Sequence, residues 1–289
     1  MGKLKYNLKY ALSKIQFFFH PLRFSVMSIE DTLQEIERKK SIIRFGDGEF
    51  SLIAGNDILF QNASKELSDK LKECLKELDN SRVLLCLPET LTGLRKFEKR
   101  VQKNWIINFA GNYSYYKQYC SPRYVYGNAF VSRPYMAYRD KTQAGKNFEH
   151  LISLFEDKNI YIIEGALSRT GVGNNLFEKA KSISRIICPS KNAYEHIERI
   201  KRVSLEKVPK DAMVLLALGP TSKPLGLWLV NNGYWVIDIG HIDSEYEWYL
   251  KRAETKIYIP FKHTAEKSDD NIEDCFDQSY LDSIIATIE

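Results

Sequence analysis

Two carboxylates separated by one residue, Asp47 and Glu49, follow a short apolar run in the segment Arg44-Phe-Gly-Asp-Gly-Glu-Phe50. If the backbone stays extended, both side chains point to the same side. Hard cations such as Mn²⁺ or Mg²⁺ take oxygen ligands and commonly share one or two carboxylates with substrate phosphates. Gly46 lets the backbone turn, and Arg44 could contact a phosphate oxygen. The segment therefore predicts a metal and phosphate site, with a solvated glycine turn as the alternative.

A second motif is the glycine-rich stretch from Glu164 to Asn175, between an apolar run and an expected helix. Glycines, hydroxyls, an arginine and a helix N-terminus together can cradle a phosphate or a nucleotide. The stretch lacks the Gly-Lys-Ser/Thr of a P-loop and the third glycine of GxGxxG. An ordinary glycine-rich turn is the alternative. The candidate nucleotide-binding residues are Ser168, Arg169, Gly171, Val172, Gly173 and Asn174.

A third motif, Gly219-Pro220-Thr221-Ser222, again links the end of an apolar run to the start of an expected helix. Its hydroxyls could donate to a ligand phosphate or base. They could equally cap the helix, which is a common use of Thr and Ser at this position.

A fourth motif gathers His241 and the acids Asp243, Glu245 and Glu247 after the apolar run that ends at Asp238. His241 could bind a metal or a diphosphate. One of the three acids could accept the proton of an acceptor hydroxyl. The alternative is a solvated acidic helix start, because carboxylates favour helix N-termini.

These motifs lie between elements that alternate along the chain. Apolar runs predict strands, and apolar residues three or four apart predict helices. The region 103–138 is aromatic and weakly periodic, and we expect connections there that could form an acceptor groove. The pattern predicts an α/β, Rossmann-like fold with a mainly parallel sheet flanked by helices, and ligands at the carboxyl ends of its strands. The expected strands are 41–45, 83–87, 160–164, 185–188, 213–218 and 235–239, and the expected helices are 28–40, 65–78, 90–101, 141–155, a helix ending at 181, 193–201, 225–231 and one near 280.

The composition, with 44% apolar and 27% charged residues, is typical of a globular protein. A net charge of +5 suits anionic partners but is too small and too dispersed for a nucleic-acid-binding protein. The cysteines show no CxxC or zinc-ligand spacing, which predicts free thiols in a reducing compartment and hence the cytoplasm. They are Cys74, Cys86, Cys120, Cys188 and Cys275.

The first 27 residues form a basic, aromatic segment with no acidic residue. It has no apolar run long enough to cross a bilayer, but it could lie on an anionic membrane surface, such as the inner face of the cell membrane. The alternative is a first helix that packs on its own domain or on another subunit of a homo-oligomer. At the other end, residues 261–289 form an acidic and polar extension.

Taken together, the four motifs, in this order, resemble the GT-D type bacterial glycosyltransferases over roughly residues 28–250. The resemblance implies a Rossmann-like fold, a UDP-sugar donor and a divalent cation held by an Asp-x-Glu motif, here Asp47-Gly48-Glu49. It also implies that the two loops line the nucleotide, and that His241 and the acids after it lie beside the diphosphate and the reacting sugar. Asn175 stands where an acid is expected, and Ser222-Lys223-Pro224 where small apolar residues are expected, which leaves the donor sugar open.

We therefore expect a metal-dependent hexosyltransferase domain at 28–260, which uses Mn²⁺ or Mg²⁺. It would act on a glycan or glycoprotein acceptor in the synthesis of bacterial surface glycans. Three alternatives stay open at this point: a nucleotide-cofactor enzyme (a dehydrogenase or methyltransferase), a non-catalytic subunit of a glycan assembly complex, and a metal-dependent phosphoesterase.

Overall fold

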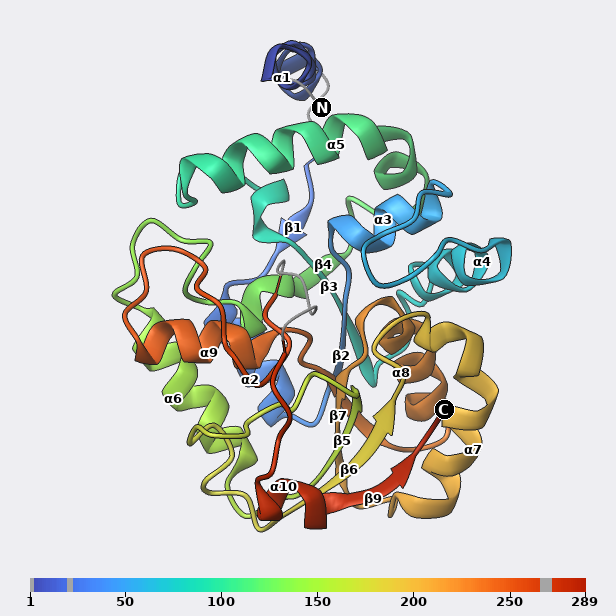
Figure 1. Ribbon diagram of the computed structural model, residues 1–289. Coiled ribbons are helices and arrows are strands. Elements are labelled where there is room, and N and C mark those ends of the chain that lie inside the picture. Colours follow the sequence, from blue (N-terminus) through green and yellow to red (C-terminus); the bar gives the residue numbers. More distant parts are fainter. Residues whose placement is uncertain (1–2, 20–22, 266–271) are drawn as a thin grey trace.

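The structure is a computed structural model that describes residues 3–19, 23–265 and 272–289, and its centre is one nine-stranded sheet (Figure 1). The strands run in the order β1-β4-β3-β2-β8-β7-β5-β6-β9, and every pairing is parallel. The predicted parallel α/β sheet is therefore confirmed. The strands are β1 (Ser25–Val26), β2 (Ser41–Arg44), β3 (Val83–Leu87), β4 (Val125–Asn128), β5 (Asn159–Gly165), β6 (Ser182–Cys188), β7 (Met213–Ala217), β8 (Trp235–Asp238) and β9 (Ile284–Thr287).

Helices cover both faces of the sheet, because its central strands are apolar on both sides. In β7, Val214 and Leu216 join one buried cluster, and Met213 and Leu215 join a second. Burying such a side chain stabilises the fold by about 1.5–3 kcal/mol. The helices are α1 (Lys3–Phe19), α2 (Ile29–Glu37), α3 (Asp47–Ile53), α4 (Lys65–Cys74), α5 (Lys99–Tyr119), α6 (Ala144–Phe155), α7 (Ile197–Lys207), α8 (Ser222–Asn231), α9 (Ile242–Leu250) and α10 (Gln278–Ser283).

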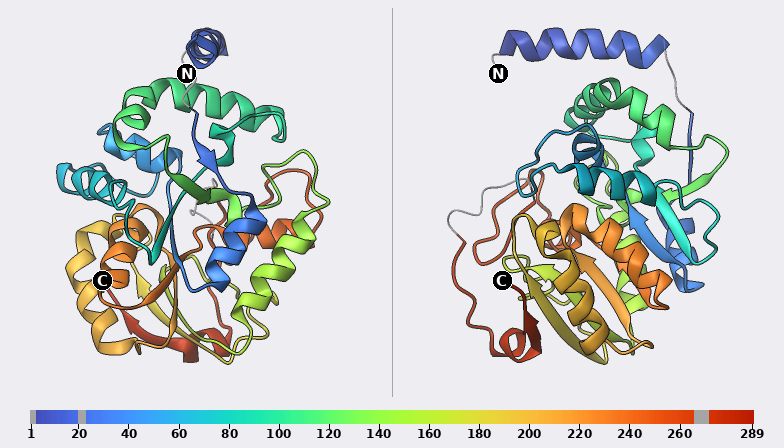
Figure 2. Two further views of the ribbon diagram at one scale, coloured as in Figure 1. Left: turned by 180° about the vertical axis from the view of Figure 1, so that it is seen from behind. Right: turned by 90° about the vertical axis from the view of Figure 1, so that its right-hand side faces the viewer.

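The two clusters lie on opposite faces of the sheet. Leu67 of α4, Ile200 of α7 and Leu225 of α8 belong to the first cluster. Leu33 of α2 and Phe148 of α6 belong to the second. The two views in Figure 2 show the corresponding helices on either side of the strands.

One helix prediction was wrong, and a longer helix was missed. The predicted helix 90–101 is reduced to a 3-10 turn at Glu89–Leu91, and α5 begins only at Lys99 and continues to Tyr119. It occupies part of the region expected to be connections. The buried residues of α5 are Ile106, Phe109, Asn112 and Tyr116, which is a helical spacing. Because aromatic residues also lie on the other faces of this helix, the helical period of its buried residues is not evident in the sequence.

The helix predicted to end at Lys181 is also wrong, because the stretch after the glycine-rich loop is a series of turns. Its backbone groups form isolated turn bonds, such as that from the amide of Ala180 to the carbonyl of Phe177, and others bond to another segment. The carbonyl of Lys179 accepts from the amide of Asp157 at 3.0 Å, and the amide of Lys181 donates to Lys158 at 3.0 Å. In addition, the Asn174 side chain accepts from the amide of Leu176 at 3.1 Å.

Both ends of the chain join the main fold. β1 pairs with β4, and β9 pairs with β6, so residues beyond 260 extend the same sheet. α1 packs along α5 (Figure 2). No helix in the described ranges is long and apolar enough to cross a membrane. All five cysteines are free thiols, as predicted.

Candidate active site

A cleft opens at the carboxyl ends of β2, β8, β7 and β5, where ligands bind in parallel α/β sheets. It has two compartments that share five residues, namely Phe60, Gly219, Gly240, His241 and His263. The first compartment is lined by small residues, among them Gly165, Ser168, Pro189, Ser190 and Pro220. The second has a volume of about 390 Å³ and is lined by charged and aromatic residues, among them Arg44, Asp47, Glu49, Trp105, Arg133 and Lys223.

Asp47 and Glu49 both line the second compartment, but not on extended backbone as predicted. They lie in the first turn of α3, where acids interact favourably with the helix dipole. Asp47 is exposed, whereas Glu49 is buried. The Oε2 atom of Glu49 accepts from the amide of Gly46 at 2.7 Å. Its Oε1 atom lies 2.8 Å from Nζ of Lys223. The motif therefore presents one exposed carboxylate and one buried carboxylate that pairs with Lys223.

These two carboxylates fit a divalent cation that shares its ligands with a bound phosphate. No group of three or more His, Cys, Asp or Glu side chains that could hold a metal occurs among the described residues. An all-protein metal cage is thus not formed by them. A cation of the Mg²⁺ type instead uses one or two carboxylates, substrate phosphates and water. Asp47 and Glu49 are suited to that arrangement.

A buried charge cluster lies beneath the second compartment. The Arg44 guanidinium donates through Nη2 to Oδ1 of Asp238 at 3.0 Å and through Nη1 to the carbonyl of Ala129 at 3.0 Å. Lys223 lies 3.2 Å from the other oxygen of Asp238. Burial opposes the charge of Lys223, but Asp238 and Glu49 raise its pKa. Arg44 thus contributes positive charge to the cleft, while its guanidinium is already held by protein acceptors.

His241 lies where the two compartments meet. Its ring centroid is 5.4 Å from that of His263 and 6.4 Å from that of Phe60. Burial, and then the surrounding His263, Arg133, Arg44 and Lys223, hold the pKa of His241 well below its usual range. The imidazole is therefore neutral at neutral pH, and it can donate one hydrogen bond and accept another.

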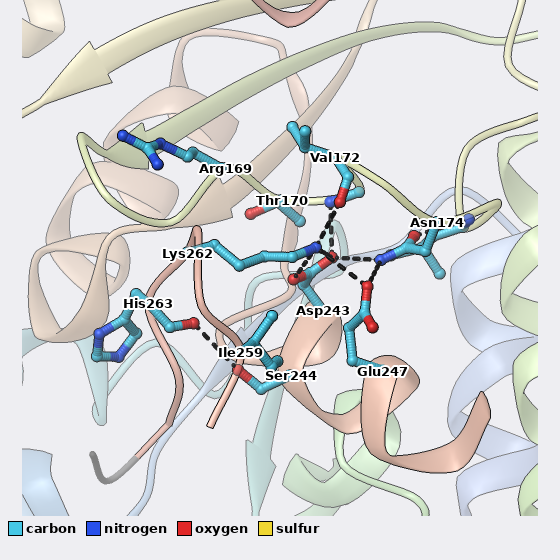
Figure 3. Close-up of polar contacts among 12 residues, drawn as sticks. Arg169, Thr170, Val172, Asn174, Asp243, Ser244, Glu247, Ile259, Lys262 and His263 are labelled. Atoms are coloured by element: carbon cyan, nitrogen blue, oxygen red, sulfur yellow. Dashed lines mark hydrogen bonds and ion pairs between the residues drawn. The ribbon is translucent and has the colours of Figure 1, made fainter. Parts of the chain in front are cut away.

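Two of the acids predicted as bases anchor the glycine-rich loop instead (Figure 3). Oδ1 of Asp243 accepts from the amide of Gly171 at 2.7 Å and from Asn174 at 2.9 Å. Asn174 also donates to Glu247 at 2.9 Å. Buried Lys262 lies 2.8 Å from Oδ2 of Asp243 and 3.3 Å from Glu247, and it donates to the carbonyl of Val172. We call Asn174, Asp243, Glu247 and Lys262 the loop anchor.

Glu245 also has a structural environment. It is fully buried, and its Oε2 accepts from the amides of Tyr135 at 3.3 Å and Met136 at 2.9 Å. Its other oxygen lies 3.6 Å from Nε of Arg133. Asp243, Glu245 and Glu247 do not line either compartment. This geometry argues against a role for them as the base, because each carboxylate is held by donors of the protein.

The two predicted nucleotide loops reach the cleft only in part. Ser168, Gly219 and Pro220 line the first compartment, and Gly46 lines the second. Arg169 instead donates to the carbonyls of Phe261 and Glu273, which ties the loop to the C-terminal segment. The remaining predicted residues line neither compartment: Gly171, Val172, Gly173, Asn174, Thr221 and Ser222.

The cleft residues that the sequence did not single out include Phe60, Trp105, Arg133, Lys223 and His263, although Trp105 and Arg133 lie in the region 103–138 that was expected to form part of an acceptor groove. Lys223 was noted in the sequence, because a small apolar residue was expected at its position. The other four carry no local motif, since they come from loops and from α5. His263 comes from the segment that was separated as a C-terminal extension.

The comparisons with known proteins agree with this fold. A family model for the glycosyltransferase GT-D fold matches residues 42–267. The chain is 43% identical over 268 residues to the probable glycosyl transferase Gly of Streptococcus gordonii, which covers 92% of this chain and 39% of that protein. It is 40% identical over 265 residues to the glycosyltransferase GlyD of Streptococcus pneumoniae, with 91% and 32% covered. The chain thus spans well under half the length of these relatives.

Solved structures match the chain almost end to end. A domain described as having a distinct glycosyltransferase fold shares 37% identity and a TM-score of 0.90, with 97% of this chain and 98% of that chain covered. A glycosyltransferase from Streptococcus sanguinis shares 42% identity and a TM-score of 0.89, with 92% and 100% covered. With the family model matching most of its length, the chain belongs to the GT-D family of glycosyltransferases.

Proposed function

We propose that this chain transfers a hexose from a UDP-sugar to a glycan or glycoprotein acceptor in the synthesis of bacterial surface glycans. We further propose that Asp47 and Glu49 hold a divalent cation, Mn²⁺ or Mg²⁺, beside the donor diphosphate. Membership of a glycosyltransferase family supports the reaction class. The donor and the metal are proposed from the form and charge of the cleft.

We place the nucleoside at the first compartment, whose volume of about 70 Å³ takes only part of it. The lining at Gly165, Ser168, Ser190 and Pro220 is small and uncharged, so the part that enters can approach the backbone closely. The hydroxyls of Ser168 and Ser190 can form hydrogen bonds with oxygens of the ribose or the base. This compartment leads directly to His241 and Gly219, which it shares with the charged compartment.

The observation that carries the proposal is a set of three cationic side chains where the compartments meet, each of which also has an acidic partner: Asp238 for Arg44 and Lys223, and Glu245 for Arg133. Arg44, Lys223 and Arg133 line the second compartment around a neutral His241. A diphosphate linked to a nucleoside in the first compartment would lie among these groups. Positive side chains placed in advance stabilise the charge that builds on a departing UDP. A bound divalent cation would add to this charge neutralisation.

The acceptor side of the cleft is aromatic. Trp105 and Phe130 line the second compartment, with their rings 6.4 Å apart and nearly perpendicular. Aromatic rings pack well against the apolar faces of sugars, because they offer large and rigid apolar area. We place the acceptor sugar beside Trp105. Because the acids of α9 are already engaged, we assign no base to them, and the stereochemical course stays open.

Calorimetric titration of UDP, with and without Mn²⁺, tests the donor and the metal together. The substitution Asp47→Asn removes the charge of an exposed carboxylate and keeps the shape of the side chain. We expect native UDP binding to require Mn²⁺ and the variant to lose this requirement along with most of its affinity. In a coupled assay of UDP release from UDP-sugars, we expect a loss of rate of roughly 10² or more.

Asp69→Asn is the matched control, because Asp69 is an exposed acid in the first half of α4 and lies outside both compartments. It should bind UDP and Mn²⁺ like the native chain. Absence of UDP binding, or binding that ignores both Mn²⁺ and Asp47→Asn, would contradict the proposal. Parallel titrations with NAD and S-adenosylmethionine would then test the cofactor-enzyme alternative.

A further inference from the structure

Helix α1 has one face that packs on the protein. Tyr6 donates to Asn104 of α5 at 3.4 Å, and Gln16 donates to the carbonyl of Ala110 at 3.3 Å. The ring of Phe17 lies 5.2 Å from that of Phe109 in an edge-on contact. Ser13, on the same side of α1, is buried. Because this face packs on α5, the opposite face of α1 is turned away from α5.

The opposite face of α1 is apolar and exposed. Leu8, Leu12, Ile15 and Phe19 follow one another at intervals of three or four residues, so they form one stripe along the helix. Their exposed fractions are 62%, 60%, 57% and 70%. Apolar residues scattered singly on a surface need no explanation, whereas a contiguous stripe marks an interaction site. Figure 2 shows this helix at the outer edge of the molecule, beyond α5.

Basic residues flank the stripe on both sides. Lys9 and Lys14 are exposed, and at about 100° per residue they fall on opposite flanks of it. The neighbouring helix α5 adds exposed Lys99, Arg100 and Lys103 at its start. The sequence has no acid before Glu30. Within α1, the apolar stripe is therefore flanked by positive charge and by no acidic residue.

This charge pattern distinguishes between the partners that could cover the stripe. Two copies of the chain that met through it would bring the lysine flanks of both helices together, with no acid in α1 to neutralise them. An anionic bilayer would accept the apolar residues at the depth of its headgroups and neutralise the lysines. Each such Lys near an anionic surface contributes about 1 kcal/mol.

We propose that α1 docks this protein on an anionic lipid surface of the kind found at the cytoplasmic face of a membrane, with Leu8, Leu12, Ile15 and Phe19 inserted among the headgroups. α5, which carries α1, also supplies Trp105 to the cleft. The docked helix therefore lies one helix layer from the wall of the cleft. This inference is independent of the donor and metal proposed above.

Flotation of the full chain with vesicles tests the inference. We expect binding to vesicles of phosphatidylcholine with phosphatidylglycerol, little binding to phosphatidylcholine alone, and release as salt is raised. The double substitution Leu12→Ser and Ile15→Ser should weaken binding about tenfold or more. Lys9→Glu with Lys14→Glu should abolish the preference for the anionic lipid.

Matched controls separate docking from general effects on the protein. Leu205→Ser changes an exposed leucine of α7, and Lys65→Glu with Lys76→Glu reverses two exposed charges near α4. Both controls should bind vesicles like the native chain, and all variants should keep the native melting temperature. Failure of the native chain to float with anionic vesicles would overturn the inference. So would equal binding by all variants, or a dimer in light scattering that Leu12→Ser with Ile15→Ser dissociates.

Discussion

The ammonium of Lys223 lies 2.8 Å from Oε1 of Glu49, so one of the two carboxylates proposed to bind the metal is already paired with a positively charged side chain. The same ammonium lies 3.2 Å from Oδ2 of Asp238. Lys223 thus pairs with two buried acids from a position at the start of α8, and Arg44 supplies a second positive charge beside Asp238. A cation bound at Asp47 and Glu49 would share Glu49 with this lysine. When no cation is bound, the stability of the site depends on Lys223.

Replacing Lys223 by methionine should destabilise the protein strongly. The substitution keeps the length of the side chain but leaves Glu49 and Asp238 short of a partner in a buried setting. Breaking a buried ion pair in this way costs about 3–5 kcal/mol. Urea denaturation at neutral pH measures the loss. Lys251→Met is the control, because Lys251 is about half exposed and its pair with Glu247 should contribute less than about 0.5 kcal/mol.

Replacing Lys262 by methionine should loosen the loop anchor. Asp243 and Glu247 would then repel each other, and the carbonyl of Val172 would lose its donor. We expect faster hydrogen exchange at the amide of Gly171, which donates to Asp243. UDP affinity should fall roughly tenfold, because the same loop presents Ser168 to the first compartment.

Lys181→Met is the control for this prediction, since Lys181 is exposed and follows the loop in sequence. It should leave both the exchange rate and the UDP affinity unchanged. Native exchange at Gly171 in the Lys262→Met variant would show that the anchor does not hold the loop.

Six of the nine strands and the strand-end motifs were predictable from the sequence, because buried parallel strands are short apolar runs and ligands bind at their ends, whereas β1, β4 and β9 were not predicted. This reasoning located Asp47, Glu49, Gly219 and His241 correctly in one cleft. It could not tell which acids face the ligand. Asp243 and Asp47 look alike in sequence, but one is held by Lys262 and the other is exposed.

The errors have a common physical cause. α5 was missed because its buried side chains include Asn112 and its exposed faces include aromatics, so local hydrophobicity gave no clear period. His263 and Lys262 were missed because the tail that carries them looked polar. Lys262 is fully buried among acids, a pairing that tertiary structure alone creates.

The pH dependence of stability should report on His241. Its folded pKa lies well below the usual value near 6.5, because the imidazole is buried and surrounded by His263, Arg133, Arg44 and Lys223. Above about pH 7 the residue is neutral in both folded and unfolded states and has no effect. Below about pH 6.5 the unfolded chain takes up a proton that the folded chain does not, so stability falls by up to about 1.4 kcal/mol per pH unit.

His241→Gln should therefore lose less stability than the native chain between pH 7 and pH 5, as measured by chemical denaturation at each pH. His150→Gln is the control, because His150 lies at the surface beside Glu37 and far from the cleft residues in the fold. The control should keep the native slope. An unchanged slope in His241→Gln would show that His241 is not held neutral by its surroundings.

Replacing Gly219 by alanine should disturb the junction between the two compartments without unfolding the protein. Gly219 has a φ of +53°, and a Cβ there would lie 2.5 Å from Cε2 of Phe60. Phe60 must then move, and it lines both compartments. We expect UDP binding to weaken about tenfold, together with a loss of stability of about 1–2 kcal/mol from the left-handed backbone.

Gly233→Ala separates these two effects of the Gly219 substitution. Gly233 has a φ of +87°, and a Cβ added there would have no atom within 4 Å. That control should show the same backbone strain with native UDP affinity, and equal binding losses in both variants would mean that Phe60 does not shape the cleft.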